Sequence, residues 1–265
     1  MATNNQGSRA AREAAAAARA QAKAQTQKRE RTIQLIGGLA VLVVVAVLVV
    51  IAITKKPPTT SIGALPTGVT KDTLGVQVGT AWSASNASSI PKLQIWEDFQ
   101  CPACKNLEDA NGANILSLAN SGKVRLEWRP TIFLDTNLQG QNSAAGNPNS
   151  SALATMAFGC AVDAGKAEQF HTTLFAHQPQ EGNGYSASDL TKYAGMSGIN
   201  GKAMDTFNNC LSSKKYNGWV QNSFKAFNDA GVTSTPTGVL NGKTLDPKIL
   251  YTPAELTKAI ASATK

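Results

Sequence analysis

The hydrophobic pattern divides the chain into an apolar run, a polar spacer and a body with both strand and helix periods. Residues 33–53 are apolar throughout, with Gln34 the only clearly polar member. At 1.5 Å per residue these 21 residues span about 31 Å, enough for a hydrocarbon core of roughly 30 Å. The run is too long for the apolar core of a cleaved signal peptide. It predicts a single uncleaved transmembrane helix, which we place at residues 32–54.

The first half of the body shows strand patterns around one helix. Short apolar runs and alternation of apolar with polar residues, as at Val124, Leu126 and Trp128, are typical of strands. Pro102 suits the first position of a helix, where its missing N–H is not needed. The expected elements are a short edge strand at 75–79, strands at 93–99 and 123–134, and a helix at 102–120.

The second half is mostly helical by its periodicity. The Asn/Gly/Gln-rich stretch 135–149 is expected to be a loop. Asn241-Gly242 suits the type I′ turn of a β-hairpin, and Thr252 stands where it would cap the last helix. Helices are expected at 151–164, 166–177, 188–195, 202–211, 214–230 and 254–263, the third capped by Ser186 or Ser188. The order strand, helix, strand, helical block, hairpin, helix predicts an α/β fold.

Charge sets the expected orientation of the chain. Four Lys and Arg residues lie between positions 23 and 31, against Lys55 and Lys56 beyond the apolar run. The more basic flank normally stays in the cytoplasm, so residues 1–31 are expected to be a basic, Ala-rich cytoplasmic tail and the body to be extracytoplasmic. From Pro57 onward, 16 Lys and Arg face 15 Asp and Glu. The body therefore has no basic excess, and we expect no nucleic-acid partner.

The chemistry of the chain centres on the sequence Cys101-Pro102-Ala103-Cys104. The expected helix start would place Cys101 beside unpaired N–H groups and the positive end of the helix dipole, which favour its thiolate. The thiolate is the reactive species in disulfide exchange. Cys104, one turn further on, can close a disulfide with Cys101.

Two other interpretations of this C-x-x-C motif stay open on the residues alone. The motif could be a purely structural disulfide, although a loop of this length is tight for that role. It could also be half of a zinc site, which needs four ligands. The other candidate ligands form no second close pair, and they are Cys160, Cys210, His171 and His177.

Two segments resemble the DsbA-type thiol–disulfide oxidoreductases of the thioredoxin superfamily. One is Phe99-Gln100-Cys101-Pro102-Ala103-Cys104, and the other is the Thr235–Pro236 element within Val-Thr-Ser-Thr-Pro-Thr-Gly-Val at 232–239. The resemblance implies a thioredoxin-like fold with an inserted helical domain, and a cis-Pro236 facing the catalytic pair, with Thr235 pairing with the client backbone. It thus predicts a linker at 55–91, a thioredoxin-like domain at 92–134 and 231–265, and an inserted helical domain at 135–230.

The cysteines are expected to form two pairs. Outside the cytosol disulfides persist, and four cysteines allow three connectivities. We choose a redox-active Cys101–Cys104 pair and a structural Cys160–Cys210 disulfide that staples the helical segment. The alternative role for the second pair is a redox relay.

The sequence departs from the family pattern at two positions. Ala103 replaces a histidine that assists the thiolate in DsbA, so the Cys101 pKa is expected to be lowered, but less than in the strongest oxidases. A helix dipole supplies at most about 2 kcal/mol, and N–H donors must supply much of the rest. Ile95 replaces the buried acid of thioredoxin that assists proton removal from the resolving cysteine. Glu97, on the same strand face, is a candidate substitute; an ordinary solvated or salt-bridged carboxylate is the alternative.

The resemblance implies an extracytoplasmic enzyme that oxidises cysteines of secreted or cell-envelope proteins. It implies a membrane partner of the quinone-linked DsbB or VKOR kind, with no bound cofactor and no metal. The alternatives are a disulfide reductase or isomerase, and a redox-inert, membrane-tethered chaperone or binding module. Trp96, Phe99 and Trp128 are expected in the core, and Phe133 and Phe170 are expected to line the groove between the two domains.

Overall fold

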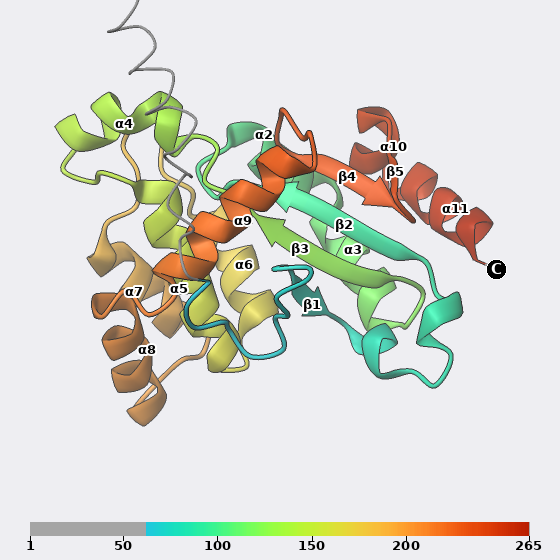
Figure 1. Ribbon diagram of the computed structural model, residues 1–265, viewed down its shortest axis with the longest axis horizontal. Coiled ribbons are helices and arrows are strands. Elements are labelled where there is room, and N and C mark those ends of the chain that lie inside the picture. The colour runs from blue at the N-terminus through green and yellow to red at the C-terminus, as the bar shows by residue number, and fades with distance from the viewer. Residues whose placement is uncertain (1–61, 265) are drawn as a thin grey trace, which may run out of the picture. The chain divides into compact units, whose positions relative to one another are not determined.

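The computed structural model describes residues 62–264 (Figure 1). The predicted cytoplasmic tail, the transmembrane segment at 32–54 and the first part of the linker lie outside the described residues. Within the described part, no helix is long and apolar enough to cross a bilayer. The described residues 62–264 belong to one compact unit.

A five-stranded mixed sheet in the order β1-β3-β2-β4-β5 runs through this unit. Central strand β2 pairs in parallel with β3 and antiparallel with β4, while β1 and β5 form the two edges. In Figure 1 the arrows of β2 and β3 point toward the helical block, opposite to β4. The strands are β1 (Val76–Val78), β2 (Lys92–Glu97), β3 (Arg125–Pro130), β4 (Thr237–Leu240) and β5 (Lys243–Thr244).

The two central strands bury one face through alternate residues. Leu93 and Ile95 of β2 lie opposite Leu126 and Trp128 of β3, and all four are almost fully buried. Because side chains alternate along a strand, Glu97 shares the face of Ile95 and enters the same core. Its side chain is nearly inaccessible to solvent. Strand β2 therefore contributes both apolar core residues and the buried carboxyl group of Glu97, its last residue.

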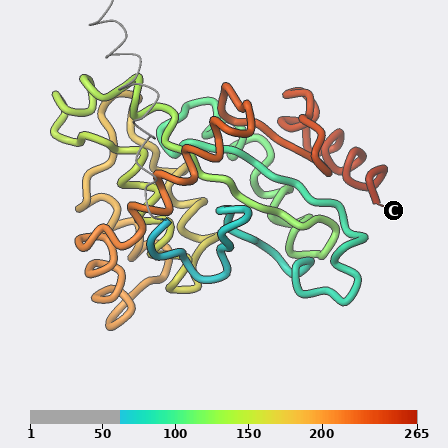
Figure 2. The backbone as a smooth tube through the Cα atoms, viewed as in Figure 1, coloured from blue at the N-terminus to red at the C-terminus, as the bar shows by residue number. Residues whose placement is uncertain are grey.

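Helices cover the sheet and fill the segment between β3 and β4. Helix α3 packs on β1 and β3, while α9 crosses in front of the sheet in the view of Figure 1 and contacts β3. The tube in Figure 2 shows the chain leaving β3 for this block and returning to the sheet at β4. The main helices are α2 (Pro102–Leu107), α3 (Ala113–Asn120), α4 (Asp135–Ala144), α5 (Ser150–Asp163), α6 (Ala167–Ala176), α7 (Ala187–Met196), α8 (Lys202–Ser212), α9 (Asn217–Asp229), α10 (Pro247–Tyr251) and α11 (Pro253–Ala263).

The helix expected over 102–120 is present but contains a π turn. Residues Glu108–Gly112 form this wider turn between α2 and α3. A side chain at position 112 would collide with the Glu108 carboxylate, so Gly112 leaves the room that this carboxylate occupies. A π turn is wider than a regular helical turn, so it places its side chains differently. The turn here carries Glu108, an acid with a buried side chain.

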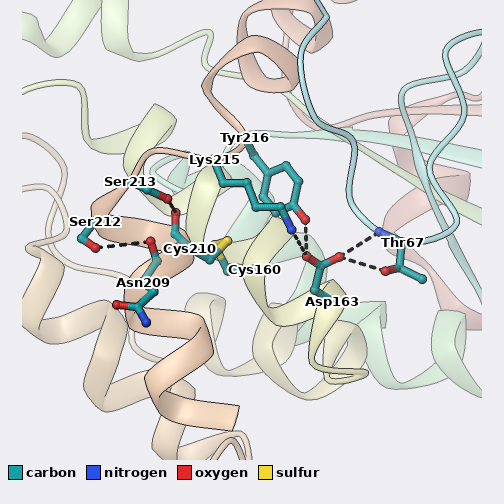
Figure 3. The surroundings of a disulfide bond; sticks show 9 residues. All are labelled: Thr67, Cys160, Asp163, Asn209, Cys210, Ser212, Ser213, Lys215 and Tyr216. Carbon is teal, nitrogen blue, oxygen red and sulfur yellow. Dashed lines mark hydrogen bonds and ion pairs between the residues drawn. A yellow bond between two sulfur atoms is a disulfide. The ribbon is translucent and has the colours of Figure 1, made fainter. Parts of the chain in front are cut away.

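A disulfide joins Cys160 of α5 to Cys210 of α8, 50 residues apart in sequence (Figure 3). Beside it, the Asp163 carboxylate accepts hydrogen bonds from Thr67 and from the Tyr216 hydroxyl, and pairs with Lys215 at 2.8 Å. The pKa of Asp163 is lowered, because hydrogen bonds from Lys215, Tyr216 and Thr67 outweigh its partial burial. This corner thus ties the segment before β1 to the helices.

Most of the expected elements are confirmed, including the α/β class, the edge strand and the hairpin. Asn241 and Gly242 both adopt positive φ, as a type I′ turn requires. The N-cap of α7 is Ser186, which forms a reciprocal capping box with Asp189. Thr252 stands before α11 as expected, but its side chain makes no capping hydrogen bond.

Two expectations from the pattern are wrong. The loop expected at 135–149 is largely helix α4, because buried Leu138 and Asn142 and an acidic residue at its first turn support a helix whose composition is otherwise polar. Phe170 does not line a groove: it is fully buried and packs edge-on against Phe207, with ring centroids 5.7 Å apart. Phe133 is half-buried and contacts Phe227 of α9.

Replacing Cys160 and Cys210 together with alanine should lower the free energy of unfolding. Closing a loop of this length contributes roughly 4 kcal/mol in the chain-entropy model, because the cross-link restricts the unfolded chain. Denaturant unfolding of the full-length protein, with and without the double substitution, measures the difference. An unchanged midpoint would contradict a stabilising role, and a lost Cys101–Cys104 exchange in a folded variant would favour the redox-relay alternative.

Candidate active site

The C-x-x-C motif begins where β2 ends. Cys101 is the N-cap of α2, with an extended backbone, and Pro102 occupies the first helical position. The Cys101 N–H donates to the Asp98 carbonyl oxygen at 2.9 Å, which closes the turn between strand and helix. Both cysteines are free thiols. Cys101 is 7% exposed, whereas Cys104, on the inner side of the first turn, is fully buried.

Hydrogen-bond donors around the Cys101 sulfur stabilise its thiolate. The Cys104 thiol contributes most, and the Thr235 side chain and the N–H groups of Cys104 and Ala103 add to it. Together they outweigh burial and lower the pKa of Cys101 to about 6. The expected direction of this pKa shift is therefore found in the structure. The donors are supplied by the helix start and by the Thr235 loop, with no histidine involved.

The second cysteine behaves in the opposite way. Burial raises the pKa of Cys104 well above its ordinary value, and its hydrogen bond to Cys101 and the nearby Glu97 add to this effect. Cys101 is thus the thiolate and Cys104 the protonated thiol near neutral pH. A lowered pKa favours the thiolate, which is the reactive form in disulfide exchange, and this holds for Cys101 but not for Cys104.

The Thr235–Pro236 element lies directly beside the motif. The peptide bond between these residues is cis. The Cys101 sulfur lies 3.4 Å from the Thr235 carbonyl oxygen, across a sequence separation of 134 residues. Thr235 and Pro236 are half-buried at the mouth of the site, next to the beginning of β4. The fold therefore brings together the two segments that carry the family resemblance.

Glu97 lies in a buried cluster with Glu108 and His171, so the solvated alternative for this carboxyl group is wrong. The Oε2 atom of Glu97 is 3.1 Å from His171 Nε2, and Glu108 Oε2 is 3.9 Å from His171 Nδ1. The imidazole ring stacks on Trp128, with centroids 3.7 Å apart. Strand β2, the π turn and α6 thus each contribute one polar group to an otherwise apolar interior.

Burial decides the protonation of this cluster. Desolvation raises the pKa of Glu97 to about 8, with the nearby Cys101 adding to the rise. Desolvation and the proximity of Glu97 likewise raise the pKa of Glu108 to about 8. Burial lowers the pKa of His171 to about 4. Near neutral pH the carboxyl groups of Glu97 and Glu108 are therefore mostly protonated, and the His171 imidazole is uncharged.

The same three side chains have the composition of a metal site. One ligand atom from each lies within 4.8 Å of the others, and this is the one group of three or more such residues between positions 62 and 264. The cysteine motif does not belong to it. Cys160 is bonded to Cys210, and neither Cys101 nor Cys104 belongs to a group of three or more potential metal ligands among residues 62–264.

The turn before Cys101 is anchored to the helical block. Asp98 accepts hydrogen bonds from Ser151 Oγ at 2.6 Å and from the Leu134 N–H at 2.8 Å. Gln100 donates to Asp135 at 3.1 Å. Desolvation raises the pKa of Asp98 to about 7. The helices that follow β3 therefore fix the position of the redox motif.

Sequence reasoning missed several residues of the site. Glu108 stands four residues after Cys104, one helical turn away, and this spacing is a signal that could have revealed it. Gln178 and Tyr251 come from distant segments and carry no such signal, and His171 was considered only as a zinc ligand. Tyr251 donates a hydrogen bond to the Ala103 carbonyl oxygen at 2.8 Å, and burial, together with the two cysteines and Glu97, raises its pKa to about 12.

Comparisons with known proteins agree with this geometry. Residues 84–262 match the protein family Thioredoxin_4, described as Thioredoxin. No curated protein matches the sequence significantly.

Solved structures show the same fold. The disulfide bond oxidoreductase DsbG of Mycobacterium tuberculosis is 26% identical with a TM-score of 0.57, over 71% of this chain and 86% of that one. Reduced DsbA of the same organism is 25% identical with a TM-score of 0.57, over 71% and 91%. MdbA of Actinomyces oris, at 22% identity and a TM-score of 0.59 over 77% and 91%, shares the fold. The chain therefore belongs to the thioredoxin family, and within it to the DsbA-like thiol–disulfide oxidoreductases.

Proposed function

We propose that this protein oxidises cysteines of secreted or cell-envelope proteins outside the cytoplasm through its Cys101–Cys104 pair. The observation that carries the proposal is the asymmetry of the pair, with a lowered pKa at Cys101 and a raised one at Cys104. A stable Cys101 thiolate favours the reduced form of the pair, and a pair that is stable when reduced is a good oxidant.

The reaction proceeds through a mixed disulfide. A client thiolate attacks the Cys101 sulfur of the oxidised pair, the bond between Cys101 and Cys104 breaks, and Cys104 leaves as a thiolate that takes up a proton. A second client thiolate then attacks the client sulfur of the mixed disulfide and releases the Cys101 thiolate. The client loses two electrons and gains a disulfide, and the enzyme pair is reduced.

Glu97 is proposed to handle the proton of Cys104. The leaving Cys104 sulfur is buried, and its high pKa means that it must be protonated. When ionised, Glu97 is close enough to raise the pKa of Cys104, and its own pKa near 8 keeps it mostly protonated at neutral pH. A donor with a pKa near the working pH is effective in both directions, so Glu97 can also take the proton back when the pair is reoxidised.

Thr235 and Pro236 are proposed to align the client. They lie beside the Cys101 sulfur, where the Thr235 backbone can pair with an extended client segment. The proposed location is the outer side of the cell membrane, with residues 32–54 as the anchor and the N-terminus in the cytoplasm. A quinone-linked membrane oxidase of the DsbB or VKOR kind is the proposed partner that reoxidises the pair.

Two other functions would use the same fold differently. A reductase would need a pair that is stable when oxidised, which a lowered Cys101 pKa disfavours, whereas an isomerase acts with its pair reduced and is compatible with that lowered pKa. A chaperone or binding module would need no free thiol at position 101. The protonation asymmetry therefore supports the oxidase over the reductase, and the free thiol at Cys101 supports a redox function over a binding module.

The oxidised full-length protein should form disulfides in a reduced, unfolded client protein, and Cys101→Ser should abolish this activity. Loss of the nucleophilic sulfur removes the mixed disulfide, whereas a binding module would keep its effect on client aggregation. Client thiols are counted by alkylation after mixing at equal concentrations. A Cys101→Ser variant that oxidises as fast as the unsubstituted protein would contradict the proposal.

The thiolate of Cys101 should titrate with a pKa of about 6. Absorbance of the reduced protein at the thiolate band should rise as the pH increases through this value, because the thiol loses its proton there. Cys101→Ser should remove the step, and Cys104→Ala should retain a step at higher pH, since the Cys104 thiol is the largest stabilising donor. A step near the ordinary cysteine pKa in the unsubstituted protein would contradict the assignment.

Glu97→Gln should slow client oxidation at pH 7 on the order of a hundredfold, the lower end of what a positioned general acid contributes. Because Glu97 donates only when protonated, the advantage of the unsubstituted protein should shrink as the pH rises through about 8. Stopped-flow measurement of the two proteins over pH 5–9 tests this. The matched control is Glu181→Gln at an exposed position. Equal, pH-independent rates for Glu97→Gln would exclude the role.

A further inference from the structure

Gln178 lies just beyond the C-terminal end of α6, in the segment between β3 and β4. Its backbone is well defined: the Gln178 N–H donates to the Phe175 carbonyl oxygen at 3.3 Å, and Pro179 follows it. A residue before proline is restricted to extended conformations. The Gln178 side chain therefore starts from a fixed point, although it belongs to no helix or strand.

The amide group of Gln178 reaches the redox motif. Its Nε2 atom donates to the Phe99 carbonyl oxygen at 2.8 Å and to the Cys101 carbonyl oxygen at 3.0 Å. A primary amide has two N–H donors, so this nitrogen is fully used. The two acceptors lie on either side of Gln100, and Gln178 thereby clamps the last turn before α2.

Of these two acceptors, the Cys101 carbonyl group is the one that links Gln178 to α2. It also accepts the Lys105 N–H at 3.1 Å, the first backbone hydrogen bond of α2. The direction of this carbonyl fixes the backbone angle of Cys101 as the N-cap. That angle in turn decides how the Cys101 sulfur faces the N–H groups of Ala103 and Cys104, which stabilise its thiolate.

Tyr185 also contacts the turn before α2, but only at Phe99. The Tyr185 hydroxyl lies 3.0 Å from the Phe99 carbonyl oxygen and 3.0 Å from that of Leu174. Tyr185 therefore reaches the first of the two clamped carbonyls, whereas Gln178 reaches both. If Gln178 is removed, Tyr185 still holds Phe99, but the Cys101 carbonyl loses its side-chain donor.

We propose that Gln178 is a positioning residue that sets the oxidising strength of the Cys101–Cys104 pair by holding the Cys101 backbone in its N-cap conformation. The proposal rests on the redox function proposed above and deepens it. It assigns a chemical role to the segment between β3 and β4. Through one amide, the helices following β3 regulate the stability of the Cys101 thiolate without touching the sulfur.

The test is Gln178→Met in the full-length protein, a change that keeps the length of the side chain and removes both donors. The equilibrium constant for oxidation of reduced glutathione by the protein should fall by roughly fivefold, the effect of one net hydrogen bond. The Cys101 pKa, followed by thiolate absorbance, should rise in parallel, because the reduced form loses stability through its thiolate. Gln169→Met on the exposed face of α6 is the matched control and should change neither quantity.

If Gln178→Met does not fold, a second variant, Gln178→Glu, tests the same proposal. Gln178→Glu is nearly isosteric, cannot donate when ionised and places a negative charge beside the motif, so the equilibrium constant should fall by more than in the methionine variant. Variants that fold and exchange with glutathione as the unsubstituted protein does, with the same Cys101 pKa, would overturn the proposal. If the unsubstituted pair itself does not exchange with glutathione, the proposed function fails instead.

Discussion

The stabilisation of one sulfur at the start of α2 is the interaction on which the rest of the site depends. Cys101 gains its lowered pKa from the Cys104 thiol, Thr235 and two backbone N–H groups, and these come from two places along the chain, the start of α2 and the Thr235 loop. Cys104 differs because the same helix turn buries it. One turn of helix thus produces a reactive thiolate beside a protonated thiol. The remaining structure keeps that turn in place.

Both the sheet and the helices between β3 and β4 contribute residues that surround the cysteine motif. Strand β2 carries Glu97 into the core directly below the motif, and α6 provides both His171 to the buried cluster and the chain leading to Gln178. Asp98 ties the intervening turn to the N-terminus of α5 through Ser151. The segment between β3 and β4 therefore does more than enlarge the molecule. Its contacts converge on four residues, 98–101, that set the chemistry of the pair.

Sequence patterns predicted the parts of this arrangement that depend on local physics. The period of apolar residues located the strands and nearly all helices, and the position of Cys101 before Pro102 predicted its environment. The pattern failed at α4, since packing of Leu138 outweighs a polar composition there. It also could not find the pairing of His171 with Glu97, because this contact depends on how α6 packs and no spacing along the chain encodes it. Gln178 was missed for the same reason.

The equilibrium reduction potential of the Cys101–Cys104 pair in the full-length protein tests the central claim most directly. If the donors around Cys101 make the reduced pair stable, titration against glutathione buffers should give a potential closer to that of DsbA, about −120 mV, than to that of thioredoxin, about −270 mV. A value near the thioredoxin end would show that the thiolate is not stabilised enough for an oxidant. It would identify the pair as a reductant and contradict the account.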